Sequence, residues 1–248
     1  MTATVSALWR HPIKGVGAEP LDSVTLTAGA RMPGDRIWAV VQDGARMERA
    51  ADGWTHCRSF LRGAKSAELM AVTAASDGET ITLTHPRRDP ITLDLRREDD
   101  RAALMDWVRP IYPENRPGPA SVIEATQGMS DSPKPYLSIL STTSLRVLSE
   151  KAGLPLDQRR FRGNIWLRGL GPWEEFDLVG RTIRVGDVTL AVEDRIDRCA
   201  APSGNPETGR RDTDILRILE ESWGHVDFGV FARVIEGGPV ARGDAVSW

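Results

Sequence analysis

The stretch Asp194-Arg-Ile-Asp-Arg-Cys199-Ala-Ala-Pro-Ser-Gly-Asn-Pro-Glu-Thr-Gly209-Arg-Arg-Asp212 joins a predicted strand to a long loop rich in glycine, proline and serine. Its single cysteine, Cys199, follows the strand directly and has two arginines shortly before it and two more at the end of the loop. Cations near a thiol favour the thiolate, which is the form that binds metals or attacks electrophiles. The alternative is a small, buried structural cysteine. The stretch therefore places a candidate reactive thiol at the end of a strand.

Around this stretch, most of the chain consists of short runs in which apolar and polar residues alternate, each ending at a turn signal such as Gly186-Asp187. Helical spacing of apolar residues occurs at 99–108 and 213–223, and Ser141 fits the N-cap of a third helix. The pattern predicts an α+β, β-rich fold with two β-barrel-like lobes and a few short helices. Strands are expected near residues 5–9, 24–27, 36–41, 81–83, 91–95, 164–167, 183–185, 188–192, 228–234 and 245–246.

A proline-rich segment divides the chain. Four prolines lie between Pro110 and Pro119, which is typical of a linker or a seam between domains. We therefore expect one lobe over residues 1–115 and a second over residues 120–248. A ligand site is expected between them, since clefts between lobes are common binding sites.

The composition excludes several classes of protein. The net charge is −3 and no basic block is present, so the chain is not expected to bind nucleic acid. The N-terminal stretch MTATVSALWRHPIKGVGAEP has no apolar run long enough for a signal peptide or a membrane span. We therefore expect a cytoplasmic protein with no membrane partner.

The two cysteines, Cys57 and Cys199, are too few for an iron–sulfur cluster or an all-cysteine zinc site. A disulfide between them is not expected in a reducing compartment. The sequence also lacks the GxGxxG, Walker, HExxH and GxSxG patterns, so it offers no recognisable site for a nicotinamide or flavin cofactor. Any redox chemistry would need electrons from a separate protein.

Several short motifs, in order, resemble the MOSC domain found at the C-terminus of molybdenum-cofactor sulfurases. The front of the chain resembles the β-barrel domain that precedes the MOSC domain, and the order is that of the bacterial and mitochondrial amidoxime-reducing branch. The MOSC-like motifs are Arg162-Gly-Asn164, Val185-Gly-Asp187-Val188, Asp197-Arg198-Cys199, Asn205-Pro-Glu-Thr-Gly209 and Phe228-Gly-Val-Phe-Ala232, and the N-terminal ones are His11-Pro-Ile-Lys14, Glu19-Pro-Leu21 and Gly34-Asp-Arg36.

The resemblance implies a molybdenum–molybdopterin cofactor (Moco), with Cys199 as both the protein ligand to the metal and a catalytic residue. A soft thiolate suits such a metal. The pterin phosphate requires cationic and hydroxyl donors. The family pattern places cofactor contacts at Lys14, Arg36, Ser141, Arg162, Asn164 and Arg198.

Each of these positions also has an ordinary alternative. Arg36 and Arg162 could be surface cations, and Lys14 a turn cation. Ser141 is an N-cap on either interpretation, because a helix N-terminus also favours anions. Asn164 could simply begin a strand.

Two further candidates come from histidines. His225 follows a helix end and is our candidate catalytic proton donor, although a histidine at that place is more often a cap. His56-Cys57 could suggest a metal pair, but adjacent residues on a strand point apart and no second pair exists, which favours structural packing. Glu193-Asp194 is expected to be a solvated strand end.

The sequence departs from the family pattern in two places. Gly15 stands where a serine often follows the lysine, and Pro202 and Ser203 stand where a threonine pair often follows the cysteine. Proline has no N–H and a fixed φ, so the loop cannot offer the same donors. These departures bear on substrate chemistry more than on metal binding.

Three functions remain open. The leading one is reduction of small N-hydroxylated compounds at a cysteine-ligated molybdenum, supplied by a separate electron-transfer protein. The second is a carrier that holds molybdopterin without turnover. The third is sulfur transfer through a persulfide on Cys199.

Overall fold

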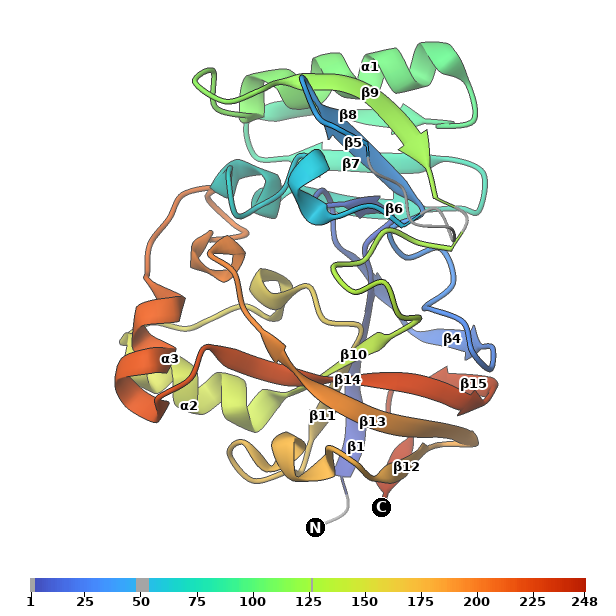
Figure 1. Ribbon diagram of the computed structural model, residues 1–248, viewed down its shortest axis with the longest axis vertical. Helices are drawn as coiled ribbons and strands as arrows, with labels where there is room; N and C mark the ends of the chain where they lie inside the picture. The colour runs from blue at the N-terminus through green and yellow to red at the C-terminus, as the bar shows by residue number, and fades with distance from the viewer. Residues whose placement is uncertain (1–2, 48–53, 126) are drawn as a thin grey trace.

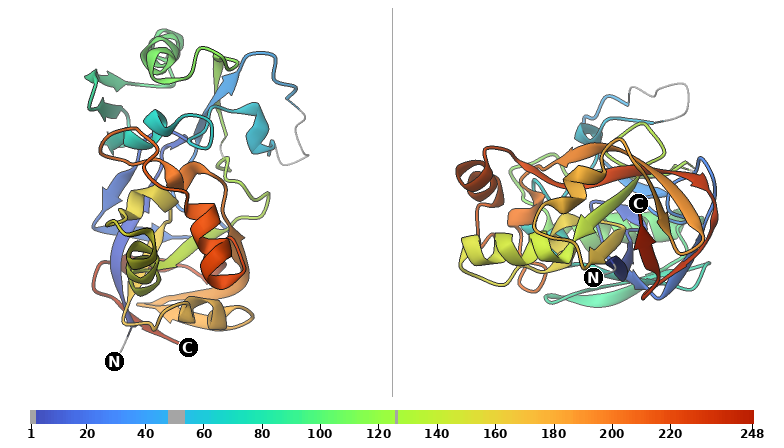
Figure 2. Two further views of the ribbon diagram at one scale, coloured as in Figure 1. Left: turned by 90° about the vertical axis from the view of Figure 1, so that its left-hand side faces the viewer. Right: turned by 90° about the horizontal axis from the view of Figure 1, so that it is seen from below.

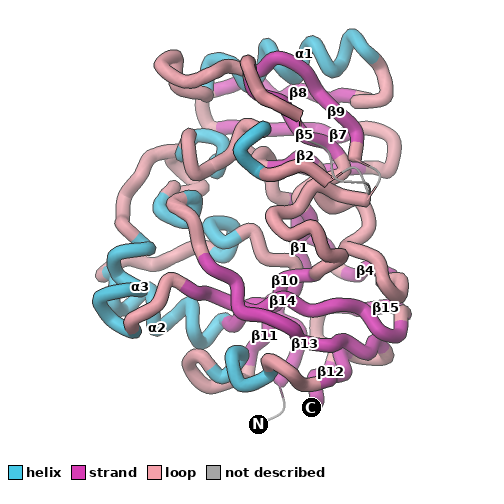
Figure 3. Tube along the Cα trace, viewed as in Figure 1, coloured by secondary structure: helices cyan, strands magenta, loops and turns pink. Residues whose placement is uncertain are grey.

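The computed structural model describes residues 3–47, 54–125 and 127–248. Two lobes are stacked along the long axis of the molecule, and both chain ends lie at the far end of the lower lobe (Figure 1). The side view shows the same stacking (Figure 2). Strands dominate both lobes and helices are few (Figure 3). The predicted α+β, β-rich class is confirmed.

The lower lobe is a closed barrel of seven strands, in the order β11-β10-β14-β13-β12-β16-β1 and back to β11. Its interior holds aliphatic side chains from every wall, among them Val5, Ile139, Leu190 and Val230. A short strand, β3 (Glu19–Leu21), pairs with the outer edge of β1, and β4 (Ser23–Leu26) pairs with β15 (Gly238–Ala241). The barrel strands are β1 (Ala3–Arg10), β10 (Leu137–Ser141), β11 (Ile165–Arg168), β12 (Thr182–Val185), β13 (Val188–Asp197), β14 (Asp227–Glu236) and β16 (Ala245–Ser247).

The upper lobe is built from two three-stranded sheets. One contains β2 (Ile13–Lys14), β5 (Trp38–Gln42) and β9 (Pro119–Glu124); the other contains β6 (Thr73–Ser76), β7 (Ile81–His85) and β8 (Arg88–Leu93). Helix α1 (Glu98–Val108), which matches the predicted helix, packs against β8 and β9. The sheets and the helix share one core, which includes Leu83, Leu104 and Val122.

The two helices of the second half lie against one flank of the barrel (Figure 1). Both end where the sequence predicts, and the second begins at Ile215, two residues after its predicted start. Helix α2 (Thr142–Ala152) is capped by Ser141, whose hydroxyl accepts hydrogen bonds from two amides of the first turn. It ends at Gly153, which has a φ of 70°. Helix α3 (Ile215–Trp223) ends at Gly224 with a φ of 72°. Left-handed residues at these ends stop a helix and suit glycine.

The chain passes between the lobes more often than the proline-rich segment suggested. Strand β1, within the predicted 1–115 lobe, pairs with β11 and β16 of the barrel. Strand β9, which begins at the end of the predicted linker, runs antiparallel to β5 in the upper lobe. Val122 is buried there, and this burial accounts for the strand continuing past the last proline.

One predicted strand boundary is wrong. The strand expected from Arg36 begins at Trp38, because Arg36 has a φ of 55° and cannot continue an extended ladder. No helix within the described ranges is long and apolar enough to cross a membrane.

Candidate functional site

Cys199 lies just beyond the end of β13 and is exposed. The loop that follows is held rigidly by a buried arginine. The guanidinium of Arg160 makes two bonds to the Asp212 carboxylate, at 2.8 and 2.7 Å, and a third to the carbonyl of Pro202 at 3.2 Å. The hydroxyl of Ser203 is buried and accepts a hydrogen bond from the Ile215 amide at 3.3 Å. The thiol is therefore presented by a fixed loop.

This loop also contacts the upper lobe. Arg211 donates to the carbonyls of Ala200 and Ala64, both at 2.8 Å, and so ties the residue after Cys199 to the other lobe. Gly63 and Gly204 both lie against the Met70 side chain, which a Cβ at either position would approach to 3.0 Å or less. Cys199 is thus placed at the junction of the lobes.

Arg198 is fixed beneath the thiol. Its guanidinium donates to the carbonyls of Phe228 and, at 2.9 Å, Phe161. Burial lowers the pKa of Arg198 to about 10, against the opposing negative charges of Cys199 and Asp131. The other arginine before the thiol, Arg195, instead places its guanidinium over the ring of Phe176. Arg198 therefore interacts electrostatically with Cys199.

Lys14 ends β2 with its side chain almost fully buried. The ammonium donates to the carbonyl of Met129 at 2.9 Å and to Oδ1 of Asp131 at 2.6 Å. Burial lowers the pKa of Lys14, and Asp131 opposes this effect. A buried ammonium is stable only with such partners.

Arg36 and Arg162 face each other across the lobes, and both have left-handed backbones, with φ of 55° and 50°. Arg36 donates to the carbonyl of Arg162 at 3.0 Å and forms an ion pair with Asp35. Arg162 donates to the carbonyls of Gly17 at 2.9 Å and Ile13 at 3.2 Å. Burial, and then the nearby Arg36, lower the pKa of Arg162 to about 9.

Behind Arg36 stands a buried pair that sequence reasoning did not identify. The His11 amide donates to Oδ1 of Asp35 at 2.7 Å, and the imidazole Nδ1 lies 3.2 Å from the same oxygen. Burial and then Arg162 lower the pKa of His11 to about 3, so the ring is neutral. Burial opposes ionisation of Asp35, but Arg36 and His11 outweigh it and hold the pKa of the carboxyl well below its usual range. Both residues stand in motifs that carry the family resemblance, His11-Pro and Gly34-Asp-Arg36, but the sequence predicted no role for either.

The four cations converge on one exposed carboxylate. Partial desolvation opposes ionisation of Asp131, but Lys14, Arg36 and Arg162 lower its pKa to about 2. Arg198 also lies within electrostatic range of Asp131. Four positive side chains from four separate segments thus lie around Asp131, and one of them, Arg36, is also paired with Asp35. Their excess charge makes the cluster a site for an anion.

The structure does not bring Ser141 to this cluster. Ser138 of β10 accepts from the Asn164 amide, whereas Ser141 is paired with Leu167, three residues further along the parallel strands. At about 3.3 Å per residue this places Ser141 roughly 10 Å from that end. Its hydroxyl is occupied by the cap of α2.

Asn164 is buried and fully engaged within the fold. Its Oδ1 accepts from the amide and hydroxyl of Ser138, and its Nδ2 donates to the carbonyl of Trp9 at 3.3 Å. Asn164 therefore joins β1 to β10 immediately beside Arg162.

His225 lies close to Cys199, because their neighbours in the chain are hydrogen-bonded. The Arg198 amide donates to the carbonyl of Val226 at 3.0 Å. Its Nδ1 accepts from the Asp227 amide at 3.1 Å. The ring packs edge-on against Trp173 and Phe176, with centroids 5.6 and 5.4 Å away. The proton of the neutral ring therefore resides on Nε2.

The second cysteine lies nearer to the cluster than the sequence suggested. Cys57 is half-buried, its Sγ accepts from Nη1 of Arg62 at 3.1 Å, and its charge acts on Lys14. His56 is exposed, and its Nδ1 accepts from the Arg58 amide. Within the described part of the chain, no three or more His, Cys, Asp or Glu side chains are grouped to hold a metal ion.

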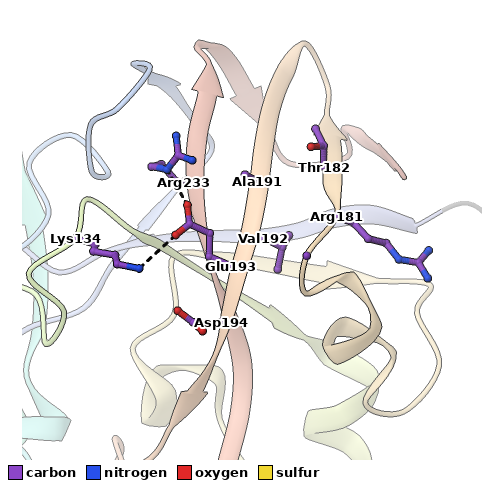
Figure 4. A pocket seen from close by; sticks show the side chains of 9 residues that line it. Lys134, Arg181, Thr182, Ala191, Val192, Glu193, Asp194 and Arg233 are labelled. Atoms are coloured by element: carbon purple, nitrogen blue, oxygen red, sulfur yellow. Dashed lines mark hydrogen bonds and ion pairs between the residues drawn. The ribbon is translucent and has the colours of Figure 1, made fainter.

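Two surface cavities lie away from the cluster. One, of about 490 Å³, runs along β13, where Glu193 bonds Arg233 at 2.8 Å and lies 3.6 Å from Lys134 (Figure 4). The other, of about 260 Å³, is lined by His85 and Arg159 at the lobe boundary. Glu193 also accepts a hydrogen bond from the Tyr136 hydroxyl, and this bond and the bond from Arg233 lower the pKa of Glu193. Neither cavity includes Cys199 or the four cations, so we attach the chemistry to the cluster.

Comparison with known proteins identifies two family domains along the chain. The family model described as the MOSC N-terminal beta barrel domain matches residues 2–109, and the model described as the MOSC domain matches residues 127–247. Among solved structures, the YuaD protein of Bacillus subtilis is 16% identical with a TM-score of 0.47, over 99% of this chain and 94% of that one. YiiM of Geobacillus stearothermophilus is 16% identical with a TM-score of 0.34, over 44% of this chain and 52% of that one.

The comparison with curated proteins finds no match. The two family models together span most of the sequence and leave residues 110–126 between them. The MOSC domain family is associated with molybdenum-cofactor binding. The chain therefore belongs to the MOSC domain family and carries the MOSC N-terminal beta barrel domain ahead of its MOSC domain.

Proposed function

We propose that this protein holds a molybdenum–pterin cofactor between its lobes and reduces small N-hydroxylated compounds. The observation that carries the proposal is the convergence of Lys14, Arg36, Arg162 and Arg198 beside the exposed thiol of Cys199. The first three lie in segments of the N-terminal lobe or face it, and the last precedes the thiol in the chain.

The residues present fit such a cofactor. A pterin phosphate needs several cationic donors at one place, and the cluster has four around the exposed carboxylate of Asp131. A molybdenum–dithiolene centre needs a soft protein ligand, and Cys199 is an accessible thiol on a rigid loop. No protein cage of metal-binding side chains is grouped in the described residues, so a metal at Cys199 would take its remaining ligands from the cofactor.

When bound, the cofactor would supply a two-electron redox centre. The overall reaction takes an N–OH compound, two electrons and two protons to the corresponding N–H compound and water. The electrons come from a separate electron-transfer protein, since the sequence has no nicotinamide or flavin motif. Arg36, Arg162 and Lys14 would hold the phosphate, and Cys199 would bind the metal. His225, which carries its proton on Nε2, is the candidate donor.

The test uses protein purified from a host that makes the cofactor. Molybdenum and pterin content are measured first. Reduced viologen and a panel of amidoximes and N-hydroxylated bases then follow. Reductant consumption that needs both substrate and Cys199 supports the reductase. A fully loaded protein that turns over none of the panel is a carrier. A protein without molybdenum or pterin whose Cys199 accumulates a persulfide transfers sulfur instead.

A further inference from the structure

The carboxylate of Asp131 lies among the four cations and is paired with the buried ammonium of Lys14. Its side chain is 72% exposed, whereas the Lys14 side chain that it bonds is 4% exposed. The loop around it is held by other groups: Arg31 donates to the carbonyls of Ser132 and Pro133 at 3.0 and 2.8 Å. The Asp131 carboxylate can therefore leave Lys14 by side-chain rotation, without moving the backbone.

We propose that Asp131 is an internal competitor for the anion site, which a bound anion must displace from Lys14. This inference deepens the proposed function and rests on the site described there. Oδ1 of Asp131 lies 2.6 Å from the buried Lys14 ammonium, where an incoming phosphate oxygen would bind. Two acidic groups cannot share that donor without repulsion.

The competition sets a minimum binding free energy that an anion needs in order to occupy the site. Displacing Asp131 costs a free energy that is a property of the protein and is the same for every anion. The apparent affinity of each anion is therefore lowered by one common factor. Monoanions of the cell that bind weakly do not gain enough free energy to displace Asp131. A ligand that also bonds the surrounding arginines gains enough. The pKa of Asp131, lowered to about 2 by its cationic neighbours, keeps the competitor charged at neutral pH.

A long-range field would behave differently. A negative charge that merely lies near the site repels a dianion about twice as strongly, in free energy, as a monoanion. Asp197 provides the matched control, since it is exposed and acts on Arg198 while making no bond to Lys14.

The experiment uses the full chain prepared without cofactor, with sulfate and acetate as probes in calorimetric titrations at pH 7.5 and low ionic strength. We expect Asp131→Asn to tighten both anions by the same factor, about tenfold, the scale of one charge-assisted hydrogen bond. Asp197→Asn should change binding less, and sulfate more than acetate. Unchanged or weaker binding by Asp131→Asn, or a gain for sulfate near the square of that for acetate, would overturn the proposal.

A crystal structure of the wild-type chain in sulfate gives a test that needs no variant. We expect a sulfate oxygen on the Lys14 ammonium and Asp131 rotated into solvent; sulfate bound at the arginines with the Asp131–Lys14 bond intact overturns the proposal. Neither measurement involves molybdenum. A chain that never takes up the cofactor can still show the displacement, and a chain that loads normally can fail it, so the two proposals fail separately.

Discussion

The guanidinium of Arg36 donates to the main-chain carbonyl of Arg162 at 3.0 Å, and both residues hold a left-handed backbone. Such backbones are uncommon outside glycine and cost free energy, so they persist where the surroundings over-determine them. Here the two arginines come from opposite lobes, and the guanidinium of each donates hydrogen bonds to main-chain carbonyls of the other lobe. They therefore both bind the lobes together and supply charge to the site.

Arg36→Ala and Arg162→Ala should each weaken pterin retention by about ten- to hundredfold, because a charge-assisted bond to a buried anion contributes roughly 1.5–3 kcal/mol. Pterin fluorescence per protein after dialysis measures the loss. Arg184→Ala, at an exposed position in β12, is the control. Normal pterin occupancy in both variants would remove these residues from the cofactor site.

Cys199→Ser should lose most of the molybdenum and keep the fold, because the thiol is exposed and the Arg160–Asp212 pair holds the loop. Metal analysis and circular dichroism measure the two effects. Cys57→Ser is the matched control, since that sulfur lies near Lys14 but accepts from Arg62. Loss of metal from the Cys57 variant alone would contradict the assignment.

Gly15→Ser should destabilise the protein, although serine often stands at this position in the family pattern. A Cβ there would lie 2.6 Å from the carbonyl oxygen of Leu61 and 2.8 Å from the Cα of Arg62, and the φ is +73°. Backbone must move, so we expect a loss of about 2 kcal/mol or more in chemical denaturation.

Gly29→Ala isolates the backbone contribution to that loss. Gly29 has nearly the same φ, +69°, but no atom of the described part of the chain lies within 4 Å of its Cβ position. Its loss should stay near 1 kcal/mol. Equal losses for the Gly15 and Gly29 variants would show that the contact with Leu61 and Arg62 is not the cause.

Glu175 should make the protein less stable as the pH rises. The side chain is fully buried, and its Oε1 has no hydrogen-bond partner among the residues that the structure describes. Burial raises the pKa of Glu175 to about 7, although Ser144 donates to Oε2. Between pH 4.5 and 7 the folded state holds a proton that the unfolded state has lost, so the free energy of unfolding falls with pH. The loss is complete above pH 7 and amounts to about 3 kcal/mol.

Glu175→Gln removes this dependence, because the amide stays neutral. The variant should be more stable than the wild type at pH 8 and similar to it at pH 5, as measured by urea denaturation at both values. Parallel stability curves for the two proteins across this range would show that Glu175 ionises normally.

The sequence predicted most elements of the fold, because alternating runs and helix caps are local signals. Ser141, Gly153 and Gly224 stand at the predicted helix ends. It did not predict the pairing of β1 with β11, since about 160 residues separate partners such as Thr4 and Arg168. Long-range pairing of this kind leaves no local pattern.

The residues of the candidate site were likewise predicted only in part from the sequence. The resemblance supplied Lys14, Arg36, Arg162, Arg198 and Cys199, and the structure gathers these at the lobe junction. Asp131 was missed because it lies in a loop with no motif, and its meaning depends on cations more than 25 residues away in sequence. Ser141 matches the family pattern, but its hydroxyl caps α2. The sequence cannot separate the two roles, because a helix cap and an anion site both use a hydroxyl at a helix N-terminus.

The position of β1 between β11 and β16 determines the order in which the protein can be assembled. Strand β1 is synthesised well before β16, and the barrel cannot close until β16 has been made. A fragment that begins after residue 126 would lack β1 and leave the edges of β11 and β16 unpaired, which invites association with other chains. Closure therefore follows the synthesis of β16, with the slow kinetics of non-local strand pairing.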